Sequence, residues 1–206
     1  MNRLEKYGPP VILNLLALLP LAWLAWDIAL GHLSVNPIQD IQIRTGRTAI
    51  IMLVVSLAGT PLYRLLGYRW LRLMRRLAGL YGFGYAALHF LNFIGVDYRF
   101  NLDYLRADAL DKRYAIAGLA ALICLLPVAV TSTRGWQRRL GRRWRYWHWL
   151  VYPAALLAVT HFFWQAKIDV SLPMVFAALI ILLLLLRLPF FRRVTAGLKS
   201  RPDTDG

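Results

Sequence analysis

Cysteine is almost absent from this sequence, and acidic residues are scarce. The 206 residues include one cysteine, and only 10 Asp and Glu stand against 25 Lys and Arg. One cysteine excludes an intramolecular disulfide framework and any metal site built from several thiolates. Cys124 lies within an apolar run and is expected to be a small core residue. Charged residues of both signs make up 17% of the chain, below the roughly 25% of soluble domains.

Nucleotide-binding loops and long connections are also missing. Neither G-x-G-x-x-G nor G-x-x-x-x-G-K-[S/T] occurs, so no familiar loop for a nicotinamide or a nucleoside triphosphate is present. No connection between apolar segments exceeds about 20 residues, too few for an independent soluble domain. We find no internal repeat and no low-complexity tract. The function is therefore expected inside a membrane or at its two faces.

Apolar residues are abundant and grouped into long segments. They make up 59% of the chain, and the mean hydropathy is +0.49. A membrane-spanning helix needs about 20 such residues. The first segment is expected to be a retained helix, because no small-x-small cleavage site follows it. The sequence predicts an all-α, polytopic bundle of about six transmembrane helices forming one domain over 1–206, with spans near 10–31, 44–66, 75–96, 114–132, 147–166 and 170–190.

The net charge of +15 is distributed unevenly along the chain. Arginines gather in the connections 64–76 and 131–146 and in the tail, whereas most acids fall in 32–43, 97–113 and 166–170. Basic residues mark the cytoplasmic connections of membrane proteins, so both termini are predicted to be cytoplasmic. Because the charge occurs in clumps between apolar segments, a membrane lipid surface is the expected partner and nucleic acid is not.

Four histidines are the principal candidates for chemistry. His32 falls in an outer connection and is expected to be a solvated loop residue, whereas His89, His148 and His161 fall in or beside predicted spans. Ionisable residues inside a membrane usually mark function, and neutral imidazole is a common ligand of haem iron. The predicted topology puts His89 and His161 at the same depth on two helices that run the same way. This arrangement predicts a b-type haem ligated from both sides.

Small residues precede both histidines at equal spacing. Gly82 and Ala86 precede His89 as Ala154 and Ala158 precede His161. Residues of this size let a planar ring approach the helix backbone, and they equally permit close packing of helices.

His148 has several possible roles. It lies nearer the cytoplasmic edge, about 20 Å from His161 along a helix that rises ~1.5 Å per residue. It could bind a second haem with an unidentified partner, share the first site, or line a polar cytoplasmic pocket. It could also be an interfacial histidine within a belt of aromatic residues, here Trp144, Tyr146, Trp147 and Trp149.

Four arginines are weaker candidates for cofactor binding. Arg75 and Arg76 could hold a phosphate, for example that of a flavin, although the topology alone accounts for them. Arg44 and Arg47, at the outer start of the second span, could pair with haem propionates or anchor the helix at the interface.

Two long motifs connect the chain with a known family. The stretches RRLAGLYGFGYAALHF (75–90) and WRYWHWLVYPAALLAVTHFFW (144–164) resemble the ferric-reductase-like transmembrane superfamily. The resemblance covers about 44–190, taken as the core that precedes a cytoplasmic tail at 191–206. It includes TGRTAIIMLVVSLAGTPL (45–62) and VTSTRGWQRRLG (130–141). Within the superfamily, the chain is most similar to the haem-binding membrane subunits of bacterial periplasmic methionine-sulfoxide reductase systems.

The resemblance implies heme b and FMN as cofactors in a multi-pass protein of the bacterial inner membrane. Electrons would come from the quinone pool or a cytosolic flavin reductase and pass to a periplasmic molybdopterin enzyme that reduces methionine sulfoxide. This chain would be the electron-transfer subunit, and the catalyst would be its partner. By position, His89 and His161 match the outer haem pair and His148 matches a third family histidine. Arg76 stands where the family pattern has a fourth.

Other functions stay open at the level of sequence. The chain could be a cytochrome b subunit for a different partner, such as a metal-ion reductase or a dehydrogenase anchor. A small proton-coupled transporter that uses the histidines for protons is a further alternative, and it predicts a colourless protein.

Overall fold

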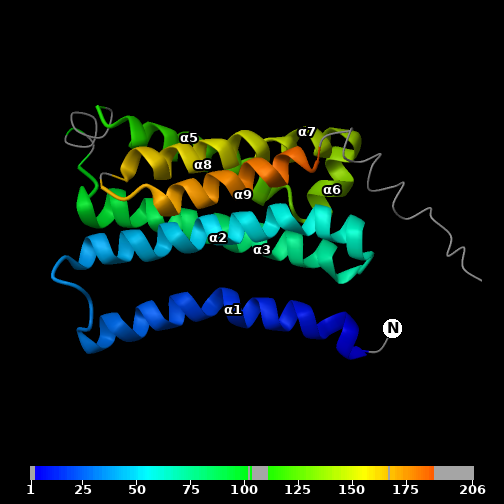
Figure 1. The fold of residues 1–206 in the computed structure, drawn as a ribbon, viewed down its shortest axis with the longest axis horizontal. Coiled ribbons are helices and arrows are strands. Elements are labelled where there is room, and N and C mark those ends of the chain that lie inside the picture. The colour runs from blue at the N-terminus through cyan, green and yellow to red at the C-terminus, as the bar shows by residue number, and fades with distance from the viewer. Residues whose placement is uncertain (1–2, 102, 104–110, 167, 188–206) are drawn as a thin grey trace, which may run out of the picture.

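Long helices lying side by side make up the protein. The computed structural model describes residues 3–101, 103, 111–166 and 168–187, and within these ranges the fold is all-α, as predicted. Six helices lie alongside one another in the bundle (Figure 1): α1 (Arg3–Leu30), α2 (Pro37–Leu66), α3 (Trp70–Leu91), α5 (Arg113–Val130), α8 (Val151–Gln165) and α9 (Ser171–Leu185).

Four of these segments have the length and hydropathy of membrane spans: Gly8–Leu30, Pro37–Leu66, Trp70–Asp97 and Arg113–Val130. The spans predicted at 147–166 and 170–190 form shorter helices. α8 and α9 have 15 residues each, or about 22 Å at ~1.5 Å per residue, less than the ~30 Å of a hydrocarbon core. A turn at Leu150 separates α8 from the six-residue α7 (Trp144–Trp149). Residues 188–190 of the last predicted span lie outside the described part.

Local signals set the ends of α2. The side chain of Asn36 accepts a hydrogen bond from the backbone N–H of Gln39, and Pro37 occupies the first helical position, where its missing N–H is not needed. At the other end Gly67 adopts a left-handed conformation, with φ of 77°, and its N–H bonds to the carbonyl of Tyr63. α3 therefore returns beside α2 after a short turn.

Small residues bring α2 and α3 close together. A Cβ atom on Gly59 would lie 2.7 Å from the Cβ of Arg75, and one on Gly82 would lie 3.4 Å from the carbonyl oxygen of Ala49. The hydroxyl of Ser56 donates to the carbonyl of Arg75 at 2.9 Å. Gly82 thus permits helix packing, the simpler of its two predicted roles.

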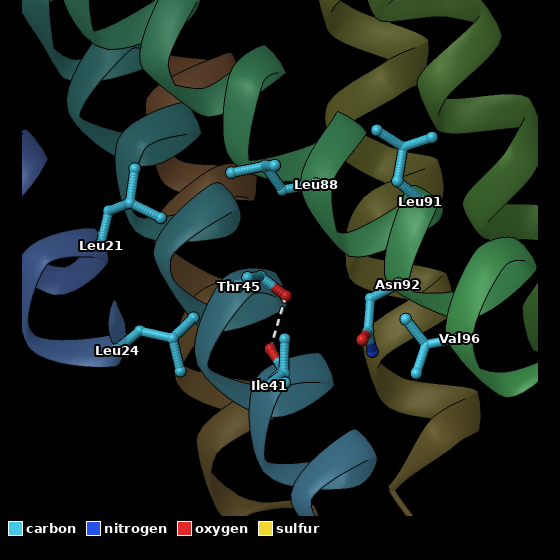
Figure 2. A pocket seen from close by; sticks show the side chains of 8 residues that line it. All are labelled: Leu21, Leu24, Ile41, Thr45, Leu88, Leu91, Asn92 and Val96. Carbon is cyan, nitrogen blue, oxygen red and sulfur yellow. Dashed lines mark hydrogen bonds between the residues drawn. The ribbon is translucent and has the colours of Figure 1, made fainter. Parts of the chain in front are cut away.

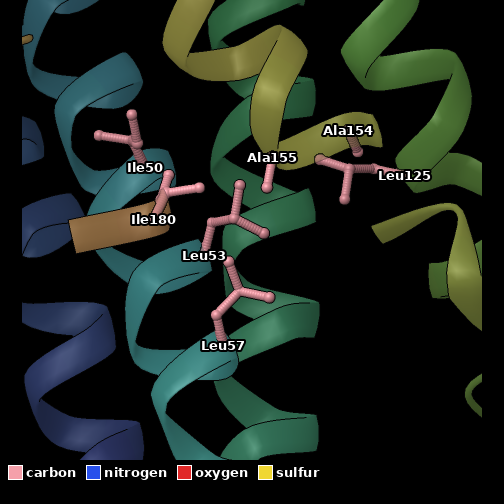
Figure 3. Packing of buried hydrophobic residues seen from close by; sticks show 7 residues of the cluster. All are labelled: Ile50, Leu53, Leu57, Leu125, Ala154, Ala155 and Ile180. Atoms are coloured by element: carbon pink, nitrogen blue, oxygen red, sulfur yellow. The ribbon is translucent and has the colours of Figure 1, made fainter. Parts of the chain in front are cut away.

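The main core lies among α2, α5, α8 and α9. Figure 3 shows the side chains of this cluster converging from the four helices: Ile50, Leu53, Leu57, Leu125, Ala154, Ala155 and Ile180. Cys124 is partly buried and packs against the cluster, which confirms its prediction as a core residue. Ala154 belongs to this core, so it also serves helix packing.

The connections alternate between the two ends of the bundle (Figure 1). One end contains the start of α1, the α2–α3 turn, α6 (Arg134–Leu140), η2 (Gly141–Arg143), α7 and the end of α9. We call it the arginine-rich end, since it carries the basic segments 64–76 and 131–146. The opposite end contains the α1–α2 and α8–α9 connections and η1 (Asn92–Asp97), a π-helical extension of α3. This alternation is the one expected from the charge pattern.

A buried carboxylate ties α1 to α2 at the opposite end. The guanidinium of Arg44 forms an ion pair with Asp27 of α1 and a second with Asp40 on its own helix, where Nε and Oδ1 lie 2.8 Å apart. The Asp27 side chain is 10% exposed and that of Arg44 is 35% exposed. Solvent therefore screens the attraction between Arg44 and Asp27 only in part.

We expect Asp27→Asn to lower the thermal unfolding temperature of the purified protein. The substitution removes a charge-assisted contact worth about 1–2 kcal/mol after discounting for the exposure of Arg44. The matched control is Asp97→Asn, which removes an exposed carboxylate at the same end. Equal unfolding temperatures for the two variants would contradict a role of Asp27 in holding α1.

Candidate functional site

Two histidines from distant parts of the chain meet near the opposite end. His89 lies on α3 and His161 on α8, and their ring centres are 5.9 Å apart, with an angle of 87° between the ring planes. Both side chains are partly buried. The expected approach of these two imidazoles is therefore present, and we call them the imidazole pair.

The δ nitrogen of each ring is fixed by a backbone carbonyl. His89 Nδ1 lies 3.0 Å from the carbonyl oxygen of Gln42 on α2, and His161 Nδ1 lies 2.7 Å from that of Tyr114 on α5. A carbonyl oxygen can only accept, so Nδ1 carries the proton in both rings and Nε2 keeps its lone pair. In each case the carbonyl lies 47 residues before the histidine. The two halves of the site are thus built alike, although no repeat is evident in the sequence.

A glycine lies beneath each ring. A Cβ atom on Gly46 of α2 would approach His89 Nδ1 to 2.9 Å, and one on Gly118 of α5 would approach His161 Nδ1 to 2.7 Å. Each glycine follows the bonded carbonyl residue by one helical turn. The absence of a side chain lets the ring lie against the neighbouring helix and reach the carbonyl.

A polar network borders His89. The amide nitrogen of Gln42 lies 3.1 Å from His89 Nε2, and the amide oxygen of Gln42 accepts from Asn92 Nδ2 at 2.6 Å. Asn92 Nδ2 also donates to the carbonyl of Ile38 at 3.1 Å. A metal ion bound to His89 Nε2 would therefore have to displace the amide of Gln42.

Beside this network is an apolar hollow of about 270 Å³ between α1, α2 and α3. Figure 2 shows Asn92 facing it from one side and Thr45 from the other. The hollow is smaller than the roughly 300–1,000 Å³ of usual ligand pockets, and neither histidine of the pair lines it. Its lining residues are Leu21, Leu24, Ile41, Thr45, Leu88, Leu91, Asn92 and Val96.

His148 lies apart from the pair, near the arginine-rich end. It is on α7, with its ring centre 3.9 Å from that of Trp144. Its Nε2 lies 3.5 Å from the hydroxyl of Ser132, and its Nδ1 lies 3.3 Å from the carbonyl of Trp144. Arg75 is an electrostatic neighbour of this ring. The structure thus brings His148 close to one of the arginines considered for phosphate binding.

The four candidate arginines have different surroundings. Arg44 donates to Asp27 and Asp40, so these carboxylates occupy the donors considered for propionates. Arg47 is exposed. Arg75 donates to the hydroxyl of Thr60 at 3.0 Å. The Nε atom of Arg76 is buried without a hydrogen-bond partner in the described part.

Sequence reasoning missed the residues that orient the imidazoles. Gly46 and Gly118 lie on helices other than those of the histidines, and the contacts of Gln42 and Tyr114 are made by their backbones. A signal existed, since both carbonyls and both glycines keep the same distance from their histidines along the chain. This equal spacing identifies the supporting residues only when the packing of α2 with α3 and of α5 with α8 is known.

The fold and the site define a class of helical membrane proteins in which two packed helix pairs, α2 with α3 and α5 with α8, each bring one histidine to the same region of the bundle. We call these two helix pairs hairpins. Residues 45–159 match the family described as the ferric reductase like transmembrane component.

Curated relatives narrow the class. The chain is 44% identical to a protein-methionine-sulfoxide reductase heme-binding subunit MsrQ of Rhodospirillum rubrum, over 87% of this chain and 88% of the relative. It is 40% identical to an MsrQ of Xanthomonas oryzae pv. oryzae, over 79% of this chain and 74% of the relative. It is 38% identical to an MsrQ of Herminiimonas arsenicoxydans, over 85% and 82% respectively. The chain belongs to the ferric-reductase-like transmembrane family and, within it, to the group of MsrQ proteins.

Proposed function

We propose that this protein binds b-type haem between His89 and His161 and carries electrons across the membrane for a methionine-sulfoxide reductase. The observation that carries the proposal is the meeting of two imidazoles whose Nδ1 atoms donate to carbonyls, so that Nε2 is the nitrogen left for coordination. At His89 this requires the amide of Gln42 to move away from Nε2. The relatives' names, which describe heme-binding subunits, support it.

The dimensions of the imidazole pair suit one shared metal ion. A metal–imidazole bond is about 2 Å long, so two rings on one ion have centres about 6 Å apart. The observed separation is 5.9 Å. Among the residues that the structure describes, no group of three or more His, Cys, Asp or Glu could hold a metal ion. Two imidazoles would complete the coordination of an iron that a macrocycle already holds.

The residues around the pair orient the ligands and limit water. The carbonyls of Gln42 and Tyr114 fix the ring orientation and raise the basicity of the coordinating nitrogens. Gly46 and Gly118 let both rings approach. Haem iron, when bound, supplies the one-electron chemistry, and the protein tunes it through these ligands and the apolar surroundings. Exposed Arg47 is the proposed partner of a propionate, whereas Arg44 would first have to leave Asp27 and Asp40.

The proposed direction of transfer rests on the orientation in the membrane and on the relatives' names. By the positive-inside rule, the proposed orientation has the arginine-rich end and both termini in the cytoplasm and the imidazole pair towards the periplasm of a bacterial inner membrane. The proposed acceptor is MsrP, the periplasmic molybdopterin subunit that reduces methionine sulfoxide in oxidised proteins. The proposed donor is the quinone pool or a cytosolic flavin reductase, with FMN as a second cofactor. Catalysis belongs to the partner, and this chain transfers electrons.

A haem at the imidazole pair leaves about half of the bilayer uncrossed on the cytoplasmic side. The proposed position of a second cofactor there is beside His148, whose ring lies against that of Trp144 at a tilt and close to Arg75. We therefore expect His148→Ala to reduce the content of a cytoplasmic-side cofactor more than that of the haem at the pair. Haem and flavin released from equal amounts of purified protein measure both. Equal or greater loss of the haem at the pair would contradict this placement.

Visible spectra of the purified protein, oxidised and reduced, test the central proposal. A b-type haem with two imidazole ligands gives a low-spin spectrum whose bands sharpen on reduction. If the purified protein is colourless and does not bind haem when haem is added, the proposal is wrong. That result would favour the alternative of a small proton-coupled transporter. Copurification with a molybdoenzyme distinguishes the proposed partner from a metal-ion reductase or a dehydrogenase.

A further inference from the structure

Two arginines from distant helices share one hydroxyl at the arginine-rich end. The hydroxyl of Thr60 accepts from Arg75 Nη1 at 3.0 Å and from Arg187 Nη2 at 3.3 Å. Arg75 lies in the second turn of α3, and Arg187 follows the end of α9. Arg187 also donates to the carbonyl of Leu57 at 2.7 Å and to the hydroxyl of Tyr152 at 3.3 Å. Three helices and the end of a fourth therefore meet around two guanidiniums, which we call the arginine pair.

The arginine pair brings like charges together without a carboxylate partner among the residues that the structure describes. Each is an electrostatic neighbour of the other, and both side chains are only partly exposed. Within the described part of the chain, their hydrogen bonds all go to neutral oxygens. Like charges repel, and burial removes the water that would screen them. The Nε atom of Arg187 is buried and has no partner among the residues that the structure describes. The arginine pair therefore has an unused N–H donor and two positive charges that no carboxylate of the described part neutralises.

Carboxylates do not neutralise the pair within the described part of the chain. The two ion pairs found there both belong to Arg44, at the opposite end. The carboxylates whose side chains are described all lie in or beside connections at that opposite end: Asp27, Asp40, Asp97, Asp103, Asp111 and Asp169. An external anion is thus the group that this end of the bundle can accept.

We propose that Arg75 and Arg187, together with the hydroxyl of Thr60, form a binding site for a phosphate group. A tetrahedral phosphate offers several oxygens to two planar guanidiniums at once, and such charge-assisted contacts are strong. A phosphate monoester carries a charge of about −1.5 to −2 near neutral pH, which balances two arginines. Arg187 was not a candidate from sequence. Its contribution appears only when the end of α9 is placed beside α2 and α8.

Two sources of this group reach the end of a membrane bundle. One is the headgroup of an anionic phospholipid, and the other is a soluble phosphate monoester such as a mononucleotide. Both present the same phosphate oxygens to the arginine pair. The contacts therefore support binding of a phosphate group, and the experiment below identifies its source. For the mononucleotide source, the proposal rests on the second cofactor that the proposed function places near Arg75. For either source it is independent of the imidazole pair, which lies towards the opposite end.

Matched ligands test the site on the purified full-length protein in detergent. One arm compares flavin mononucleotide with riboflavin, which lacks the phosphate, and the other compares phosphatidylglycerol with a galactosyl diacylglycerol, which lacks it too. We expect the phosphate-bearing member of one arm to raise the thermal unfolding temperature by a few degrees, since a ligand that binds the folded state stabilises it. The arm that responds identifies the source. If neither phosphate-bearing ligand acts, or if the phosphate-free partners act equally, the proposal is wrong.

Variants tie the response to the arginine pair. Arg187→Gln and Arg75→Gln are expected to weaken binding of the active ligand at least tenfold, whereas Arg187→Lys, which keeps the charge but loses the planar fork, should weaken it less. Arg142→Gln, which removes an exposed arginine at the same end, should leave affinity unchanged. Unchanged affinity in both glutamine variants would overturn the assignment. Because His89→Ala leaves this site intact, phosphate binding and haem binding can fail independently.

Discussion

Substitution of His89 or His161 by alanine should abolish the low-spin haem spectrum while the protein still inserts into the membrane. The two rings lie 5.9 Å apart and come from different hairpins, so without either one the chain would offer a bound iron only one of the two imidazoles. The apolar core of α2, α5, α8 and α9 does not include either imidazole, so the fold should persist. Haem content per protein and the spectrum of the reduced form measure the effect, which we expect to be at least tenfold.

His32→Ala is the matched control for this result. His32 is exposed beyond the end of α1, and its loss should leave haem content unchanged. His161→Met offers a further distinction, because a His/Met pair keeps two axial ligands and raises the reduction potential of the iron. Retention of the wild-type spectrum in both alanine variants would refute the assignment of the ligands, whatever else the protein binds.

The helices and the depth of the histidines could be predicted from sequence because hydropathy and charge act locally. Each apolar segment must satisfy its backbone within a helix, and arginines mark one end. These two signals suffice to place His89 and His161 at one level. The shortness of α8 escaped prediction, since the apolar run through Trp147 and Leu150 does not reveal the turn that separates α7 from α8.

The supporting contacts could not be predicted because they depend on which helices pack together. Small residues on the histidine helices suggested room for a flat ring, yet Gly82 and Ala154 contact α2 and the main core. The glycines that contact the imidazoles lie on the partner helix of each hairpin. Arg44 illustrates the same limit, since its pairing with Asp27 depends on the position of α1.

In both hairpins a backbone carbonyl of one helix orients the histidine of the other. The distance between the two imidazoles therefore depends on how the hairpins pack against each other. The carbonyls of Gln42 and Tyr114 set the orientation of each ring separately, so a shift of one hairpin against the other changes the distance between the rings. The packing of α3 beside α5 and the main core shared by α2, α5 and α8 therefore set the distance between the two rings. The site depends on the bundle as a whole.

Alanine at Gly46 or Gly118 should lower haem affinity without unfolding the protein. The new Cβ would lie 2.9 Å from His89 Nδ1 or 2.7 Å from His161 Nδ1, closer than such atoms approach in folded proteins. The ring must move and its Nδ1 contact with the carbonyl must lengthen or break. Loss of a contact that orients a metal ligand costs about 10–100-fold in affinity. Titration of haem into the cofactor-free protein measures the change, and valine should act more strongly than alanine.

Gly84→Ala separates this effect from the general effect of alanine in a helix. Gly84 is exposed on α3, and a Cβ there would have nothing within 4 Å. Alanine favours a helix over glycine by about 0.5–1 kcal/mol, so all three variants should keep or gain helix stability. Only those at Gly46 and Gly118 should lose haem. If Gly118→Ala binds haem as tightly as Gly84→Ala, the ring of His161 is free to move, and the contact with Tyr114 does not hold it for ligation.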